Sequence, residues 1–261
     1  MSIPDRALVG TVASYRLTVS YLGAAYGGWQ RQANTIGVQE VVETALERLV
    51  REPVRLVAAG RTDAGVHAAA QEAHVRLSRA WPSRALVEGS NHYLPPDVRL
   101  LRAIPVAPDF HARAWAVAKE YHYRMSRAPV LSPFDAPTTV RIEPRLDLER
   151  LGHAAALLEG RHDFRAFARS GGSHRHSFRR VFRADVTECG PGVTFRIVGD
   201  GFLRGMVRAV VGSLLWVARG RLSLERWAAL LEGAERIGAG PSAPARGLVL
   251  VRVFYPDEPS W

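Results

Sequence analysis

The hydrophobic pattern of the chain constrains its fold most, because it switches between strand and helix periods in a regular order. Residues 15–21 alternate between apolar and polar positions, which is typical of a strand with one buried face. Residues 38–50 instead carry apolar side chains at helical spacing. Similar patterns predict strands at 54–59, 72–78 and 98–104 and a helix at 84–92. The first half therefore has the predicted order β-α-β-β-α-β.

The second half repeats this plan with additions. Its patterns predict strands at 115–127, 180–188, 193–198 and 248–254, and helices at 148–158, 203–218 and 224–233. Alternating strands interleaved with helices favour an α/β (α+β) fold, in which an antiparallel sheet carries helices on one face. The join between the halves is expected near residues 105–114, which divides the chain into segments 1–108 and 109–261.

The charge of the chain favours a polyanionic partner. The 261 residues carry a formal net charge of +10, and nucleic acid is the first candidate partner for such a basic protein. Lys119 is the only lysine, so arginine supplies 34 of the 35 basic residues (35 − 1 = 34). Arginine can grip a phosphate with two hydrogen bonds and can stack on a base. Codon bias in a GC-rich genome is an alternative explanation for arginine over lysine, but it explains the sign of the net charge less well.

Other features predict a cytoplasmic protein that does not enter a membrane. Cys189 is the only cysteine, so neither an internal disulfide nor a cysteine-based metal site can form. Asp5, Arg6 and Arg16 place charges in the N-terminal segment, so a signal peptide is not expected. The longest apolar stretch, residues 209–218, is too short to span a bilayer.

The segment Ala58–Ala68 is the most unusual part of the sequence, because an apolar strand ends there between two glycines. Asp63 lies between Gly60 and Gly65, which let the backbone turn sharply and let a ligand approach closely. An aspartate on such a turn can act as a nucleophile or as a metal ligand. A metal site needs several carboxylates or histidines, and none lies close in the sequence, whereas Arg61 is placed to keep Asp63 ionised. Capping of the turn by Asp63 is equally compatible with this segment alone.

Residues 169–179 are predicted to form a basic, mobile loop. His174 and His176 flank Arg175, a spacing that can suggest metal binding. No cysteine or acidic residue accompanies the two histidines, so RNA contact or solvent exposure is the favoured interpretation. No metal is therefore expected.

The segment Gly60-Arg61-Thr62-Asp63-Ala64-Gly65-Val66-His67 resembles the catalytic motif of the tRNA pseudouridine synthase A family. Further segments resemble that family in the same order, and the resemblance extends from about residue 15 to 255. They are residues 21–32, 37–40, 91–98, 109–113, 119–123, 201–208 and 243–248. The sequence departs from the family pattern at residues 22–24, 111–115 and 204–205, which affects details of RNA contact rather than the reaction.

The resemblance implies a role for each matched residue. Asp63 is the catalytic nucleophile that attacks the target nucleoside, and no cofactor is needed. Arg61 fills the gap that the target base leaves in the helix, and a salt bridge to Asp63 is an alternative role. Tyr121 stacks on the uracil and assists proton removal at C5, although Tyr123 lies on the same strand face and a core position is the alternative. Arg208 pairs with Asp63, or else belongs to a basic surface.

Two more residues are implied to bind the substrate. Arg204 is expected one turn before Arg208 on the same helix face. Leu248 is implied to pack beneath the target base, with an ordinary core position as the alternative. His67 belongs to the matched motif but is expected to be structural or to face RNA.

The resemblance also implies a fold and a substrate. The pseudouridine synthase fold has two ferredoxin-like halves that share an antiparallel sheet with a basic central cleft. The chain is expected to be an isomerase that converts uridine to pseudouridine at positions 38, 39 and 40 in the anticodon stem-loop of tRNA, and to act as a homodimer. The competing hypotheses are a non-catalytic RNA-binding module and a metal-dependent nuclease.

Overall fold

The first half of the chain has the predicted order of strands and helices. The computed structural model describes residues 12–169, 171 and 176–256. The elements of the first half are β1 (Ala13–Tyr21), α1 (Val38–Val50), β2 (Val57–Ala58), β3 (His67–Leu77), α2 (Ser83–Tyr93) and β4 (Val98–Val106). The order β-α-β-β-α-β is confirmed, and α1 has the predicted bounds. His174 lies outside the described residues, so the interpretation of that residue and the mobility of its loop stay predictions.

The second half adds two short strands that the hydrophobic pattern does not predict, β6 and β7. Its elements are β5 (Ala118–Ser126), β6 (Val140–Arg141), α3 (Leu148–Ala156), β7 (Gly160–Asp163), β8 (Phe178–Cys189), β9 (Gly192–Gly199), α4 (Met206–Ala218), α5 (Leu224–Leu231) and β10 (Leu248–Phe254). Two helices begin at side-chain caps: Asp147 accepts a hydrogen bond from the first turn of α3, and Ser223 does the same for α5. The last strand has the predicted bounds.

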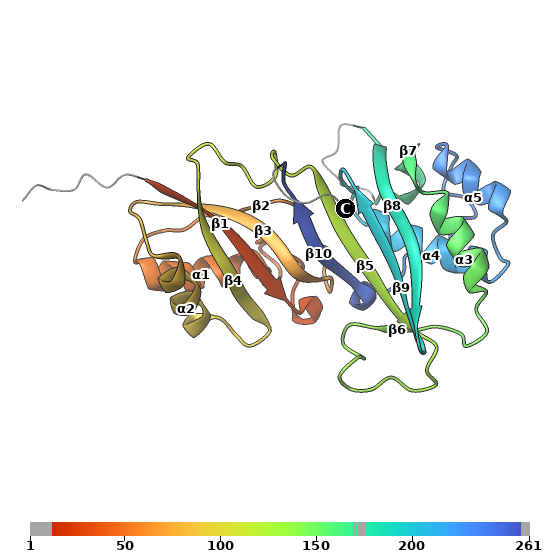
Figure 1. Cartoon of the computed structure of the whole chain (residues 1–261), viewed down its shortest axis with the longest axis horizontal. Helices are drawn as coiled ribbons and strands as arrows, with labels where there is room; N and C mark the ends of the chain where they lie inside the picture. Colours follow the sequence, from red (N-terminus) through yellow and green to blue (C-terminus); the bar gives the residue numbers. More distant parts are fainter. Residues whose placement is uncertain (1–11, 170, 172–175, 257–261) are drawn as a thin grey trace, which may run out of the picture.

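One sheet runs through both halves, and its last strand joins them. The strand order is β4-β1-β3-β10-β5-β9-β8-β7, and Figure 1 shows β10 between the strands of the two halves. The pairs in this order are antiparallel except β10 with β3, which run parallel over Val249 and Leu250. The expected shared sheet with helices is confirmed, with this parallel pair as an addition. The junction of the halves is thus built around β10.

Helices lie at the two ends of the sheet. Helices α1 and α2 lie at the end that contains β1, β3 and β4, and α3, α4 and α5 lie at the other end (Figure 1). One continuous cluster of buried apolar side chains links both groups of helices to the sheet. Leu17 and Val19 of β1 belong to this cluster, whereas Thr18 points to the opposite face and donates to Glu72 (2.7 Å). The strand alternation predicted from the sequence therefore separates core from polar face.

The helix predicted at 203–218 begins later than expected, at Met206. Gly205, the residue before it, has a φ of 70°, a left-handed conformation that glycine adopts without strain. A Cβ at this position would lie 2.4 Å from Cδ of Arg169, so a larger residue would also have to displace that side chain. Arg204 consequently lies in the turn before α4. The prediction that Arg204 lies on the same helix face as Arg208 is wrong.

Candidate active site

A large cavity lies at the junction of the two halves. Its volume is about 1190 Å³, and its walls come from the β2–β3 loop, β5, the start of α4 and the start of β10. Among the described residues, its lining includes two carboxylates, Asp63 and Asp200. The lining also includes eight Arg and Lys side chains: Arg55, Arg61, Arg113, Lys119, Arg169, Arg179, Arg204 and Arg208. The cavity therefore has the basic character that the sequence predicted for a cleft between the halves.

Asp63 begins a tight turn in the β2–β3 loop. Its backbone carbonyl accepts a hydrogen bond from the N–H of Val66 (3.1 Å). Gly65 is the third residue of this turn and has a φ of 77°, which a type II turn requires at that position. The turn is thus closed by backbone groups, and the carboxylate of Asp63 accepts no hydrogen bond within the described part of the chain. The structure does not support the alternative in which this side chain caps the turn.

Thr62, the residue before Asp63, is fixed from two sides. The hydroxyl of Thr62 is hydrogen-bonded to the hydroxyl of Tyr21 on β1 (2.8 Å). The carbonyl of Thr62 accepts a hydrogen bond from the N–H of Trp29 (3.1 Å). Gly28 permits this approach, because a Cβ there would lie 2.5 Å from the carbonyl oxygen of Thr62. The loop is therefore held in place by the backbone and β1, while Asp63 remains at the cavity.

Arg208, and not Arg61, is the cation beside Asp63. Its Nη1 lies 3.9 Å from Oδ2 of Asp63, and the side chains are 16% and 24% exposed. Arg208 lies in the first turn of α4. The Nε of Arg208 donates to the carbonyl of Ala243 (2.8 Å), which fixes the guanidinium. The expected pairing of Arg208 with Asp63 is thus present. Arg61 is exposed at the cavity and forms no ion pair with Asp63 among the described residues, so the structure gives no support to the alternative salt bridge.

Tyr121 and Tyr123 share a strand face, but only Tyr121 lines the cavity. Tyr121 is 7% exposed, and its ring meets that of Phe202 edge-on, with centroids 5.2 Å apart. Burial, with smaller contributions from Tyr21 and Asp63, raises the pKa of Tyr121 above its ordinary value. Tyr123 is fully buried and donates to the carbonyl of Pro244 (3.0 Å). The structure therefore separates a cavity tyrosine from a core tyrosine, which strand periodicity could not do.

The remaining predicted substrate-binding residues also lie at the cavity. Leu248 is 5% exposed, begins β10 and pairs with Tyr123 in the sheet. It therefore belongs both to the core and to the cavity wall, and its packing beneath the target base stays a prediction. Arg204 is exposed and lines the cavity from the turn before α4.

His67 has a structural role in the described chain. Its Nδ1 accepts a hydrogen bond from the N–H of Gly23 (3.0 Å), so the proton of the neutral ring lies on Nε2. Nε2 then donates to the carbonyl of Arg246 (3.1 Å). Burial lowers the pKa of His67, which favours this neutral form. The histidine thus connects the β1–α1 loop to the segment before β10.

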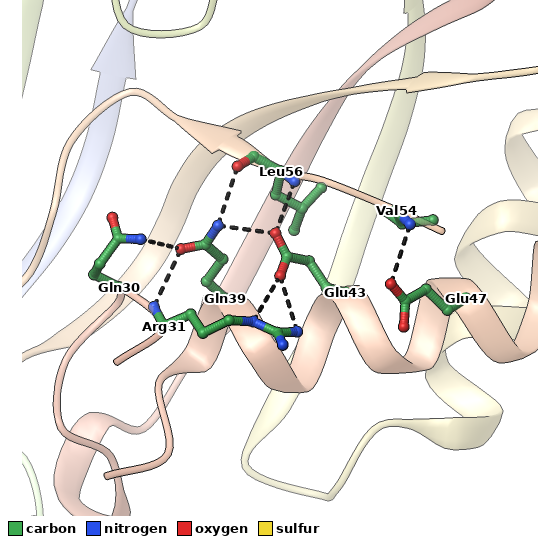
Figure 2. A network of polar contacts seen from close by, with 7 residues as sticks. All are labelled: Gln30, Arg31, Gln39, Glu43, Glu47, Val54 and Leu56. Atoms are coloured by element: carbon green, nitrogen blue, oxygen red, sulfur yellow. Dashed lines mark hydrogen bonds and ion pairs between the residues drawn. The ribbon is translucent and has the colours of Figure 1, made fainter. Parts of the chain in front are cut away.

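A polar network connects α1 to the β1–α1 loop and to the segment before β2 (Figure 2), and three of its residues, Gln30, Gln39 and Leu56, also line the cavity. The carboxylate of Glu43 is buried and accepts hydrogen bonds from the backbone N–H of Leu56 (2.9 Å) and from Nε of Arg31 (3.2 Å). Gln39 donates to the carbonyl of Leu56 (3.2 Å) and accepts from the side chain of Gln30 (2.8 Å). Helix α1 therefore holds the β1–α1 loop and the segment that leads into the loop of Asp63.

The family of the chain follows from its similarity to known proteins over nearly its whole length. It is 44% identical to tRNA pseudouridine synthase A of Syntrophotalea carbinolica over 243 residues, which cover 93% of this chain and 96% of that protein. It is 43% identical to the protein of the same name in Myxococcus xanthus, over 94% of this chain and 92% of that protein. The chain belongs to the tRNA pseudouridine synthase A family. A family model described as tRNA pseudouridine synthase matches residues 154–256.

Membership of the tRNA pseudouridine synthase A family confirms the resemblance indicated by the motifs. The family model matches only part of the second half, and the loop of Asp63 lies outside that match. The similarity to the relatives covers nearly the whole chain and so extends over both halves. Among solved structures, a chain of a Cbf5-Nop10-Gar1 complex is similar with a TM-score of 0.40 and 14% identity, over 92% of this chain and 50% of that one. That similarity is too weak to support a conclusion about the site.

The sequence motifs assign no role to five cations of the cavity wall: Lys119, Arg55, Arg113, Arg169 and Arg179. One signal in the sequence points to the first of them. Lys119 is the single lysine, and it lies two residues before Tyr121, so both side chains belong to the same strand face. Arg113 and Arg179 have no comparable signal, because Arg113 lies in a turn and Arg179 in strand β8, and only the folded chain brings both to the cavity.

The described residues contain neither a cluster of metal-ligating side chains nor a membrane-spanning helix. No group of three or more His, Cys, Asp or Glu side chains comes together there in a way that could hold a metal ion. None of the described helices is long and apolar enough to cross a membrane.

Proposed function

We propose that this chain isomerises uridine to pseudouridine in tRNA, with Asp63 as the nucleophile. The observation that carries this proposal is the state of the Asp63 carboxylate. It lies at a basic cavity, 3.9 Å from Arg208, and forms no hydrogen bond with the described residues. A carboxylate in this state is available to attack an electron-poor carbon of the sugar or the base. The family to which the chain belongs supports the same reaction.

The proposed reaction rearranges one nucleotide and leaves the atoms of the RNA unchanged in number. Attack by Asp63, at the sugar or at the base, helps to break the bond between N1 and C1′. The uracil then turns, a bond forms between C5 and C1′, and Asp63 is released from the nucleotide as a carboxylate. C5 loses its proton and N1 gains one, directly or through solvent. No electrons and no groups leave the substrate, so the reaction needs no cofactor.

Arg61 and Tyr121 are proposed to handle the flipped base. An enzyme that works on a base takes it out of the helix, which costs a few kcal/mol. Arg61 is exposed at the cavity and is not held by Asp63, so it is free to fill the gap in the RNA. Tyr121 offers a ring for stacking, which contributes about 1–3 kcal/mol per base. Because its pKa is raised, the phenol is protonated at neutral pH in the free enzyme.

We further infer that the halves 1–108 and 109–261 contribute different parts of the site. The first half supplies Arg61 and Asp63, and the second supplies Tyr121, Arg208 and Leu248. The proposed targets are uridines 38, 39 and 40 in the anticodon stem-loop of tRNA, which the family resemblance supports.

The test is incubation of the enzyme with unmodified tRNA, followed by chemical mapping of pseudouridine. The wild type is expected to form pseudouridine at positions 38, 39 and 40. Asp63→Asn is expected to lower the rate at least 10⁴-fold, on the order of the effect of removing a catalytic nucleophile, with the circular dichroism spectrum unchanged. Asp135→Asn is a matched control, because Asp135 is exposed in a loop outside the cavity.

Each competing hypothesis predicts a different result of this experiment. Full activity of Asp63→Asn would refute the proposed nucleophile. RNA binding without new pseudouridine would favour the non-catalytic module. Shortened RNA and loss of activity with EDTA would favour the metal-dependent nuclease.

We also propose that the enzyme is a homodimer in the cytoplasm. The family resemblance supports the dimer, and a single exposed cysteine, Cys189, suits a reducing compartment. Light scattering is expected to give a mass of twice 28.7 kDa. A mass of one chain at micromolar concentration would contradict the dimer.

A further inference from the structure

Lys119 has features that the proposed chemistry does not use. It is the one lysine among 35 basic residues, and its half-buried side chain lines the cavity two residues from Tyr121. Its ammonium forms no hydrogen bond or ion pair in the part of the chain that the structure describes. An ammonium has three N–H donors, and leaving donors unpaired in a partly buried place is costly. These donors are therefore available to a ligand in the cavity.

The neighbours of Lys119 favour an anion as that ligand. Arg113 and Arg179 are close enough to repel its charge, and Asp200 is the carboxylate that opposes them. Burial is the largest reason why the pKa of Lys119 falls to about 8, and the two arginines add to it. The cavity wall thus places two arginines and a single carboxylate near enough to Lys119 to act on its charge. An anion bound among them would relieve this repulsion.

The groups around Lys119 are held in place by other parts of the fold. Arg179 packs beside Gly201, where a Cβ would lie 3.6 Å from its Nε, and it donates to the carbonyl of His176 (3.0 Å). Oδ1 of Asp200 accepts the backbone N–H of Arg180 (3.1 Å). The arrangement of charges is therefore part of the folded structure.

Gly60 leaves room for the side chain of Lys119. A Cβ on Gly60 would lie 3.2 Å from Cε of Lys119, so the start of the Asp63 loop rests on the lysine side chain. The carbonyl of Gly60 already accepts a hydrogen bond from Gln71 (3.0 Å). The slender lysine side chain fits beneath this loop and carries a compact charge, which a wider guanidinium cannot reproduce.

We propose that Lys119, with Arg113 and Arg179, forms a binding site for the RNA backbone phosphate next to the target uridine. The inference rests on the proposed function, because it takes the base on Tyr121 as its reference point. Side chains two residues apart on one strand face are separated by about 6.8 Å, a distance that a single nucleotide can span. A nucleotide stacked on Tyr121 therefore brings its flanking phosphate to Lys119.

The test removes the negative charge from single RNA phosphates and, separately, the positive charge from Lys119. Full-length tRNA is assembled by ligation with one methylphosphonate, placed in separate molecules at each of the two phosphates on either side of the target uridine. Binding affinity and pseudouridine formation are measured for the wild type, Lys119→Met and Lys119→Gln. Arg84→Met is the matched control, because it removes one charge from an 85% exposed side chain on α2, outside the cavity.

The loss of affinity from the Lys119 substitutions and the loss from the methylphosphonate are expected to concern the same phosphate. With unmodified tRNA, both Lys119 variants should bind about 10-fold more weakly or worse, which is typical of a lost hydrogen bond to a charged group. The wild type should lose at least this factor with one methylphosphonate RNA, and the Lys119 variants should lose less than the wild type with that RNA, because only Arg113 and Arg179 still contact the phosphate. Arg84→Met should behave as the wild type with every RNA.

The proposal is overturned if the Lys119 variants lose the same factor at every methylphosphonate position, or if they bind as tightly as the wild type. A wild type that binds unmodified tRNA but forms no pseudouridine in it would refute the proposed function. The affinities for the methylphosphonate RNAs would still decide the phosphate site. The Gln variant, which keeps a polar side chain, guards against a folding defect specific to Met.

Discussion

Among single residues, Lys119 is expected to reduce stability in return for function. Its pKa is about 8 in the folded protein and 10.5 in an ordinary lysine. Between these values the unfolded chain binds more protons than the folded chain, so the contribution of Lys119 to stability rises with pH and is least favourable below pH 8. Lys119→Met should therefore raise the free energy of unfolding at pH 7 by about 1–3 kcal/mol. Urea denaturation should show this gain shrinking by pH 10.

The pH dependence separates this effect from a simple gain in hydrophobic packing. Arg84→Met, which changes an exposed side chain, should show no comparable gain at either pH. An equal gain of Lys119→Met at pH 7 and pH 10 would contradict the electrostatic explanation, because packing does not depend on the protonation of the replaced lysine.

The candidate site could be predicted residue by residue where a local motif exists, and less well where the fold decides. The glycines on either side of Asp63 are enough to place its carboxylate on a turn, and the family motifs pair it with Arg208. Arg61 lies only two residues from Asp63, yet among the described residues the ion pair of Asp63 is with Arg208. Tyr121 and Tyr123 have the same periodicity, so only the position of the cavity distinguishes them.

At the scale of elements, the polar stripe on α1 is expected to be essential for stability. Glu43 is 4% exposed and accepts hydrogen bonds from Gln39, Leu56 and Arg31. Glu43→Ala leaves the buried N–H of Leu56 without its acceptor and removes one acceptor each from Gln39 and Arg31, so the free energy of unfolding should fall by about 3 kcal/mol. Thermal and urea denaturation would measure the loss.

The control for this prediction is a glutamate on the neighbouring helix. Glu88 of α2 pairs with Arg84 at an exposed position, and such a pair contributes about 0–1 kcal/mol. Equal losses for Glu43→Ala and Glu88→Ala would show that the α1 network does not stabilise the fold.

The same network explains why one strand is shorter than its apolar run predicts. The run covers residues 54–59, but β2 contains only Val57 and Ala58. The N–H and carbonyl of Leu56 bond to the side chains of Glu43 and Gln39 instead of a neighbouring strand. Hydrophobic periodicity detects buried positions, and it does not reveal which groups satisfy the backbone.

At the scale of the whole molecule, the order of strands could not be predicted from the sequence. The patterns predict the two halves and the bounds of β10, but not that β10 lies between β3 and β5. Pairing between strands so far apart in sequence depends on tertiary packing rather than on local pattern. The position of β10 matters for function, because it places Leu248 and the two halves around one cavity.

The charge of this cavity predicts how strongly salt weakens tRNA binding. Eight Arg and Lys side chains and two carboxylates line it, an excess of six cations (8 − 2 = 6). If each excess cation neutralises one phosphate, the cavity contacts about six phosphates. Release of counterions should then give a plot of log affinity against log salt concentration with a slope of about −4 to −5. Lys119→Met should make the slope shallower by about one, and Arg84→Met should leave it unchanged. The rate at saturating tRNA should vary far less with salt, because the reaction occurs within the bound complex. A slope near zero would show that the cavity does not hold the RNA backbone, and binding would then have to depend on another face of the molecule.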